Sequence, residues 1–231
     1  MATVLVAVSH PDDEALYCGG TIRRLADAGH RVAVLMLTSG ENGRTLGMCA
    51  QDELAVLRAG EARAAAAALG VERLTILGFP DGGLAAQGDE LSAAVAGELE
   101  RLKPSAVFTF PPNGVNGHLD HVAAHQAVTC AVQTSREPGG ELHYFASPAE
   151  FAEPVRPGFL HPAEVARMSL ATTASVDAQE ALAAKLSALG HYESQARSVV
   201  KFMRLYPDRI IAESFHLASG PAEGNLLSPL A

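Results

Sequence analysis

Cysteine is scarce in this 231-residue sequence, and acidic residues outnumber basic ones, which gives a formal net charge of −9. Cys18, Cys49 and Cys130 form no C-x-x-C pair, which argues against a disulfide framework or a thiolate zinc site. Lysine and arginine form no block, so we expect no nucleic-acid or membrane partner, because both need a basic face. No apolar run approaches the ~20 residues of a membrane span.

Several familiar motifs are also missing. The sequence runs straight into an apolar segment without the basic region and cleavage site of a secretory leader, so we expect a cytoplasmic protein. The first apolar segment is not followed by G-x-G-x-x-G, and there is neither a P-loop nor a G-x-S-x-G nucleophile elbow. Dinucleotide binding, P-loop phosphate binding and serine-hydrolase chemistry are therefore not predicted.

Apolar runs and helical patterns alternate through the first 132 residues. The runs TVLVAVSH, RVAVLMLTSG, RLTILGFP and SAVFTFPP are continuous, which is typical of parallel strands covered on both faces. Helical patterns follow them over residues 13–28, 51–69 and 90–102, and a fourth ends near residue 132. The sequence predicts an α/β, Rossmann-like fold, with a mostly parallel sheet and helices on both faces, in one domain spanning residues 1–231.

The pattern changes after about residue 140. Residues 141–147 (ELHYFAS) and 208–218 (DRIIAESFHLA) are predicted as further strands, and residues 178–203 as one helix. Between them, residues 148–162 hold four prolines, which indicates an irregular loop. Because binding residues concentrate on long loops, we expect the rim of the binding pocket to include this proline-rich segment.

Polar residues cluster where each of the first four predicted strands ends. The clusters are residues 10–14, 38–43, 80–83 and 113–121. In an open parallel sheet, ligands bind beyond the carboxyl ends of the strands. We therefore expect the four clusters to converge on one pocket.

The first and last of these clusters contain metal-binding side chains. His10 and Asp13 stand three residues apart in a tight turn, and His118, Asp120 and His121 supply further donors from a distant loop. A divalent cation would offset the repulsion within the acidic run HPDDE, and three protein ligands with one open position are typical of catalytic zinc. The aspartates could instead only cap the following helix, but the second histidine cluster favours the metal.

Two other uses of these histidines fit the sequence less well. His121 and His125 have the spacing of the H-E-x-x-H metalloproteases, but Val122 occupies the position of the required glutamate. His125 is therefore left out of the metal set. Two histidines and one carboxylate also form the facial triad of non-haem iron oxygenases, which usually lie on β-barrels rather than on this α/β pattern.

The motifs HPDDE, GGTI and GHLDH together resemble the PIG-L/LmbE-like family of metal-dependent N-acetylglucosaminyl deacetylases. Segments similar to that family continue along the chain as TSGENGR, RAGEARAAAAALGV, LGFPDGGL and KLSALGHYESQ, so the resemblance spans roughly residues 4–200. It implies a Rossmann-like fold and a hydrolase that cleaves the acetamide of a small sugar conjugate.

The resemblance also implies roles for individual residues of the two clusters. Zn²⁺, with Fe²⁺ as an alternative, would be held by His10, Asp13 and His121. Asp12 would be the general base, since a carboxylate beside the metal but not on it can accept a proton from water. His118, as a cationic group, would polarise the amide carbonyl or stabilise its oxyanion.

Four further residues acquire roles from the same resemblance. Asp120 would orient an imidazole and tune its pKa. Glu41, Arg58 and Asp81 would contact the sugar or a substituent on it. For Arg58 an alternative stays open, because Arg58 and Glu61 have the spacing of an ion pair along one helix face.

Two positions depart from the family pattern. Asn116 stands where some members have a tyrosine, so a tyrosine role in proton transfer does not carry over, and Leu119 replaces a common proline. The loop GENGRTLG is most similar to the branch that deacetylates N-acetylglucosaminyl-malate in bacillithiol biosynthesis. The mycothiol precursor, diacetylchitobiose and a non-catalytic sugar-binding role are the alternatives. We expect a small-molecule sugar conjugate as partner and a homo-oligomer.

Overall fold

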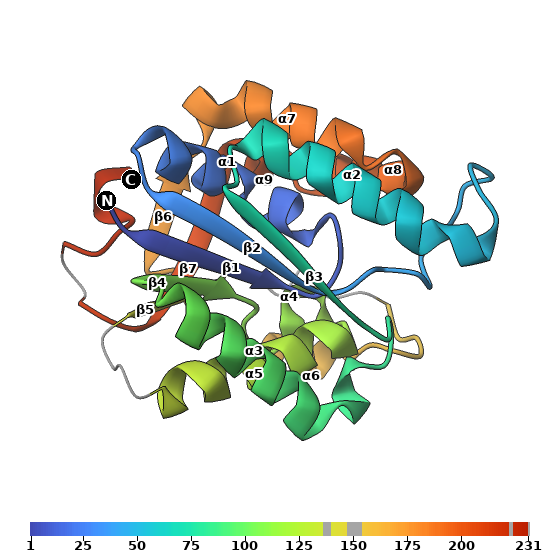
Figure 1. Cartoon of the computed structure of the whole chain (residues 1–231), viewed down its shortest axis with the longest axis horizontal. Helices are drawn as coiled ribbons and strands as arrows, with labels where there is room; N and C mark the ends of the chain where they lie inside the picture. Colours follow the sequence, from blue (N-terminus) through green and yellow to red (C-terminus); the bar gives the residue numbers. More distant parts are fainter. Residues whose placement is uncertain (136–139, 147–153, 222–223, 231) are drawn as a thin grey trace.

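One seven-stranded sheet forms the centre of the molecule in the computed structural model, which describes residues 1–135, 140–146, 154–221 and 224–230. Its strands are β1 (Thr3–Val8), β2 (Arg31–Thr38), β3 (Arg73–Phe79), β4 (Ala106–Thr109), β5 (Glu141–Phe145), β6 (Ala174–Asp177) and β7 (Ala212–Ser219). The order is β3-β2-β1-β4-β5-β7-β6 (Figure 1). Strands β1 to β5 are parallel to one another, and β7 is antiparallel to both of its neighbours, β5 and β6. The predicted mostly parallel α/β fold is confirmed.

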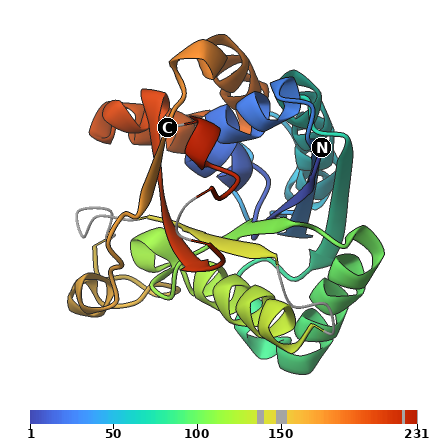
Figure 2. The same cartoon turned by 90° about the vertical axis from the view of Figure 1, so that its left-hand side faces the viewer.

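Helices cover both faces of this sheet. They are α1 (Asp13–Asp27), α2 (Leu54–Leu69), α3 (Gly88–Leu102), α4 (Gly114–Gly117), α5 (Leu119–Thr134), α6 (Pro162–Arg167), α7 (Leu182–His191), α8 (Ala196–Leu205) and α9 (Asp208–Ile211). On one face α1 packs against α2 and α7, and on the other α3 packs against α5 (Figure 1). Figure 2 shows α7, in orange, beside the blue α1, so the last third of the chain covers the first helix.

The two central strands are buried along almost their whole length. In β1 every residue from Val4 to Val8 is buried, and in β2 every residue from Val32 to Thr38. Burying one valine or leucine side chain contributes about 1.5–3 kcal/mol, which explains why these strands are continuous apolar runs. Among the described residues, no helix is both long and apolar enough to cross a bilayer.

The sequence located the first four helices to within about three residues but was wrong in the C-terminal third. Residues 178–203 do not form one helix, because the chain breaks at Tyr192 (φ −85°, ψ 58°) between α7 and α8. Residues 208–211 of the predicted strand form α9, with Pro207 at its N-cap, and the strand starts only at Ala212. The segment 141–147 forms a strand over 141–145, while α6 and β6 were not predicted.

Candidate active site

A cleft of about 980 Å³ is lined by residues from the loops after β1 to β4. The four polar clusters therefore meet, as expected, beyond the carboxyl ends of the parallel strands. Arg156 and Phe159 line the cleft as well, which confirms the rim position of the proline-rich segment for its described part. Residues 148–153 of that segment lie outside the described residues.

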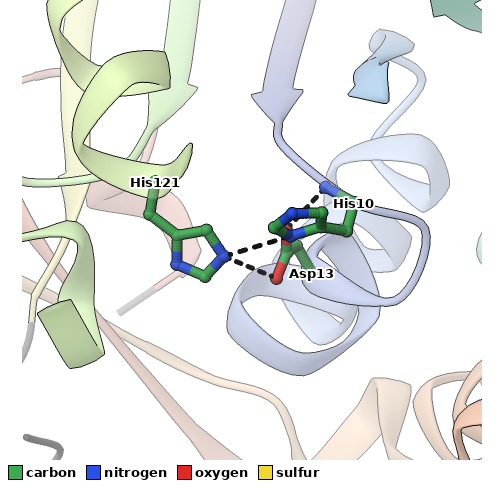
Figure 3. A group of neighbouring side chains, drawn as sticks. All are labelled: His10, Asp13 and His121. Atoms are coloured by element: carbon green, nitrogen blue, oxygen red, sulfur yellow. Dashed lines mark hydrogen bonds and ion pairs between the residues drawn. The ribbon is translucent and has the colours of Figure 1, made fainter. Parts of the chain in front are cut away.

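Three side chains point toward one another in this cleft (Figure 3). His10 Nδ1 lies 3.3 Å from both Asp13 Oδ2 and His121 Nε2, and His121 Nε2 lies 3.4 Å from Asp13 Oδ1. All three residues are buried. Tetrahedral ligands at the ~2.0–2.1 Å typical of zinc–nitrogen and zinc–oxygen bonds stand about 3.3 Å apart. The separation of the two imidazole nitrogens matches this spacing, and each nitrogen has a different Asp13 oxygen at a similar distance, so the donor set suits a zinc-like ion. It is the set that the family resemblance implied.

Hydrogen bonds behind the two imidazoles determine which nitrogen faces the centre. His121 Nδ1 donates to the carbonyl oxygen of Gly114 at 2.9 Å, which leaves the lone pair of Nε2 available. His10 Nε2 lies 3.2 Å from Asp120 Oδ2 and 3.1 Å from Asp81 Oδ1, so it donates its proton there. Partners of this kind fix the tautomer and orientation of metal-binding histidines. Asp120 is placed where a residue that orients His10 should stand.

Glycine makes the contact between His121 and the preceding loop possible. Gly114 has φ +64°, and a Cβ on it would lie 2.9 Å from the Cβ of His121. Its carbonyl therefore approaches the ring closely only because there is no side chain. Phe110 stacks on the other side of the imidazole, with 4.0 Å between ring centroids.

Three carboxylates surround His10, with Asp13, Asp81 and Asp120 at 3.3, 3.1 and 3.2 Å from its ring nitrogens. Burial lowers the pKa of His10, but hydrogen bonds to Asp120, Asp13 and Asp81 outweigh it and raise that pKa well above 6.5. For Asp13, burial raises the pKa, but His121 and His10 hold it well below its usual range. A negative potential of this kind attracts a cation.

Asp12 is buried in the same cleft but is not part of the donor set. It has φ +122°, a strained conformation for a residue with a side chain, and such strain concentrates at functional sites. Although Asp12 precedes α1, its side chain makes no capping hydrogen bond, so the helix-cap alternative is not supported. Burial raises the pKa of Asp12 to about 7, while the nearby Arg58 opposes the shift and Asp13 adds to it.

His118 is the N-cap residue of α5, and the hydrogen bond that it makes as a cap determines its tautomer. Its Nδ1 accepts the backbone N–H of Asp120 at 3.2 Å, so the neutral ring carries its proton on Nε2. Burial, together with His121 and His10, lowers the pKa of His118 to about 3. Burial is the main cause, and the His10 and His121 rings add to it from 4.9 and 5.0 Å between centroids, so these contacts favour a neutral His118 over the cationic one that the resemblance implied.

A second possible donor set combines His10, His118 and Asp120. Its oxygens are already engaged, because Asp120 accepts the backbone N–H groups of Gly82 and Leu84, at 2.7 and 3.1 Å, as well as the His10 contact. His118 Nδ1 caps α5 in the same way. The His10–Asp13–His121 set is therefore the better metal site.

The residues predicted to contact the sugar occupy three different environments. Arg58 and Asp81 line the cleft, whereas Glu41 is not among its described lining residues. The Glu41 carboxylate instead accepts the backbone N–H of Asp81 at 2.8 Å and so holds the loop after β3. The Asp81 carboxylate faces His10 and the N–H of Asn42, and its pKa is lowered by the His10 contact despite burial.

Arg58 connects two loops at the bottom of the cleft. Its Nη1 donates to the carbonyl of Gly40 at 2.9 Å and its Nη2 to that of Pro11, while Nη2 lies 3.6 Å from Asp12 Oδ1. A Cβ on Gly40 would lie 2.1 Å from Arg58 Nη1, which explains the glycine. The alternative of an ion pair between Arg58 and Glu61 is not supported, because the ion pairs of the described residues do not include it.

Sequence reasoning missed a second set of buried contacts. The Glu61 carboxylate accepts both the N–H and the hydroxyl of Ser194, at 2.7 and 2.6 Å. The Tyr192 hydroxyl donates to Glu14 at 2.5 Å, and Glu14 also accepts the N–H of Asp12 at 3.3 Å. Burial raises the pKa of Glu14 to about 7, against the effect of the Tyr192 hydrogen bond. Glu14, the glutamate at the end of the HPDDE motif, was the sequence signal that could have pointed to these contacts.

The fold and site define an α/β protein with a buried His-His-Asp donor set and a neighbouring carboxylate. Residues 5–132 match the family model described as PIG-L, GlcNAc-PI de-N-acetylase. A 1D-myo-inositol 2-acetamido-2-deoxy-α-D-glucopyranoside deacetylase from Actinosynnema mirum is 33% identical over 96% of this chain and 93% of its own length. The chain therefore belongs to the PIG-L family. Further relatives of the same name align over 57% of this chain and 53% of their own length.

Solved structures share this fold. A conserved protein from Thermus thermophilus has a TM-score of 0.71 and 27% identity, with 96% of each chain covered. An N,N'-diacetylchitobiose deacetylase from Pyrococcus horikoshii has a TM-score of 0.74 at 21% identity, covering 100% of this chain and 89% of that one. At that identity the second likeness shows the fold alone.

Proposed function

We propose that residues 1–231 form one deacetylase domain, a metal-dependent amide hydrolase that removes the acetyl group from a small N-acetylglucosamine conjugate. The observation that carries this proposal is the buried carboxylate of Asp12, which lies beside the His10–Asp13–His121 donor set without belonging to it. A protein that only binds sugar needs no proton acceptor at that place. Membership of the PIG-L family supports the same class of reaction.

The donor set indicates which cofactor suits the site. A divalent cation held by His10, Asp13 and His121 would polarise the acetamide carbonyl and make water more acidic. Two imidazole nitrogens and one carboxylate suit Zn²⁺, which we propose, and Fe²⁺ is the alternative.

The surrounding residues would perform the proton transfers. Asp12 takes the proton of the water whose oxygen attacks the amide carbon, and the neutral His118 keeps its Nε2–H and donates a hydrogen bond from it to the oxyanion that forms. The C–N bond then breaks, the proton passes from Asp12 to the departing nitrogen, and acetate and a free amine result. Asp120 keeps His10 in its required tautomer throughout.

The aglycone is the least constrained part of the proposal. The name of the Actinosynnema mirum relative makes the inositol conjugate of N-acetylglucosamine, the mycothiol precursor, the first substrate to test. The relatives reported above give no support to the malate conjugate that the loop GENGRTLG suggested. For diacetylchitobiose, the support is a likeness of fold.

Amine release from the inositol conjugate tests the proposal. We expect protein loaded with Zn²⁺ to release one amine for each acetate, and a chelator to stop the reaction. Asp12→Asn is the matched control, because it removes the proton acceptor and leaves the three donors in place. If the loaded protein binds the conjugate and other N-acetylglucosaminides but releases no amine from any, it is a sugar-binding protein instead.

A further inference from the structure

Basic side chains gather in the cleft although the chain as a whole is acidic. Six of its 17 lysine and arginine residues line the cleft, compared with three of its 26 acidic residues. The three acids, Asp12, Asp13 and Asp81, all stand at the metal-site end. The basic residues, apart from the buried Arg58, form the outer part, which we call the basic rim: Arg44, Arg156, Arg197, Lys201 and Arg204.

Helix α8 supplies three members of the basic rim from one face. Arg197, Lys201 and Arg204 are spaced by four and three residues, which places them in line, while Val199 and Phe202 are buried on the other side. Phe202 packs against Tyr17 (6.1 Å between centroids), and Tyr17 packs against His121 (6.2 Å). The basic face is thus held at a fixed place beside the donor set.

The helix itself does not account for these charges. Like charges at this spacing destabilise a helix. The helix dipole favours Arg204 in the last turn but disfavours Arg197 in the first turn. The ion pairs within 4 Å among the described residues also do not include Arg44, Arg197 or Arg204. These three arginines therefore have charge to offer a ligand.

We infer that the basic rim binds an anionic group, a phosphate or a carboxylate, on the aglycone of the substrate. This inference rests on the proposed function for the sugar, and it adds a preference that a neutral inositol conjugate does not satisfy. Guanidinium groups suit both anions because they donate two parallel hydrogen bonds to a pair of oxygens. The sugar would lie at the metal-site end, and the anion would lie between α8 and Arg44.

Two pairs of compounds that differ only in charge test the inference. One pair is the inositol conjugate of N-acetylglucosamine with and without a phosphate on the inositol. The other is the 4-carboxyphenyl and 4-carbamoylphenyl N-acetylglucosaminides. Dissociation constants are measured by calorimetry with the full chain carrying Asp12→Asn, so that binding is read without turnover.

We expect tighter binding of the anionic member, by about 10-fold, since each exposed ion pair changes an affinity by roughly 1.5- to 5-fold. The preference should shrink in high salt. It should be largely lost when Arg44, Arg197 and Arg204 are all changed to glutamine, whereas Arg63→Gln, an exposed arginine of α2 outside the cleft, should keep it. If the triple variant does not fold, each of the three single variants should lose part of the preference for the anionic compound. A preference within the inositol pair would identify phosphate as the favoured anion, and a preference within the phenyl pair would identify carboxylate.

Equal affinities within both pairs, or a preference that survives the arginine changes, overturn the inference. Amine release by the unmodified chain separates the two proposals. No release from any compound, with the binding preference intact, refutes the deacetylase function and leaves the anion site. Release from both members at equal kcat/KM, with equal affinities, leaves the deacetylase and refutes the anion site.

Discussion

Replacing Arg58 by methionine should destabilise the protein as well as slow it. Arg58 is 3% exposed, and its guanidinium donates to the carbonyls of Pro11 and Gly40, on the loops after β1 and β2. A hydrogen bond to a charged group contributes about 1.5–3 kcal/mol, so losing both should lower the free energy of unfolding by about 3 kcal/mol or more. For a chain of this size that corresponds to a Tm lower by about 6–12 °C.

The same change should alter the pH dependence of catalysis. Arg58 lies 3.6 Å from Asp12 and opposes the rise of its pKa to about 7. Without that positive charge the pKa of Asp12 rises, and because only the carboxylate accepts a proton, the acidic limb of kcat/KM should move to higher pH. Arg58→Lys keeps a charge but cannot reach both carbonyls, so it should lower Tm and shift the limb less.

Thermal unfolding and a pH series of amine release measure the two effects, with Arg63→Met on the same helix as control. The sequence-based hypothesis of an arginine that grips only the sugar predicts lost catalysis with stability nearly unchanged. A Tm within about 2 °C of the unmodified chain, outside the range expected from the two hydrogen bonds, would therefore refute the structural argument.

Three other predictions concern the site and its surroundings. Asp13→Asn should lower metal content, whereas Asp12→Asn should keep the metal and lose turnover by ~10²-fold or more; metal analysis beside kinetics would expose a reversed assignment. His121→Ala should lose metal and activity together, while His125→Ala should keep the metal because His125 Nδ1 already bonds the carbonyl of Phe110; full metal occupancy in His121→Ala would contradict the ligand assignment. Burial lowers the pKa of His143, so as the pH falls the unfolded chain binds a proton that the folded chain does not. The free energy of unfolding should therefore decline as the pH falls below about 6.5. His143→Phe should flatten this decline, and an unaltered pH dependence of the free energy of unfolding, measured by denaturant titrations, would exclude this cause.

The parts predictable from sequence are those that local patterns determine. Continuous apolar runs identified the parallel strands, and the strand ends identified where His10 and His121 would meet, because parallel strands bring their carboxyl ends to one edge. The sequence alone could not decide whether Asp12 caps α1, because that depends on where its side chain points, and in the structure the side chain makes no capping hydrogen bond.

The rest depends on contacts between segments far apart in the chain. The helical pattern of residues 178–203 is interrupted at Tyr192, whose hydroxyl donates to Glu14, and no local preference reveals that contact. Arg58 lines the cleft and Glu41 does not, yet both side chains hold backbone groups of neighbouring loops. A polar side chain after a strand has the same sequence pattern whether it binds a ligand or a loop.

The contacts of Tyr192 and Ser194 also set an order of events during protein synthesis. Glu14 and Glu61 leave the ribosome early, but their partners follow 178 and 133 residues later. Until Tyr192 and Ser194 have been synthesised, the carboxylates of Glu14 and Glu61 lack these hydrogen bonds, although β1 to β4 are already available to pair. The nascent chain can thus form much of its sheet before it can form a competent active site, and ribosome-bound chains halted before residue 192 should be inactive however well their strands have paired.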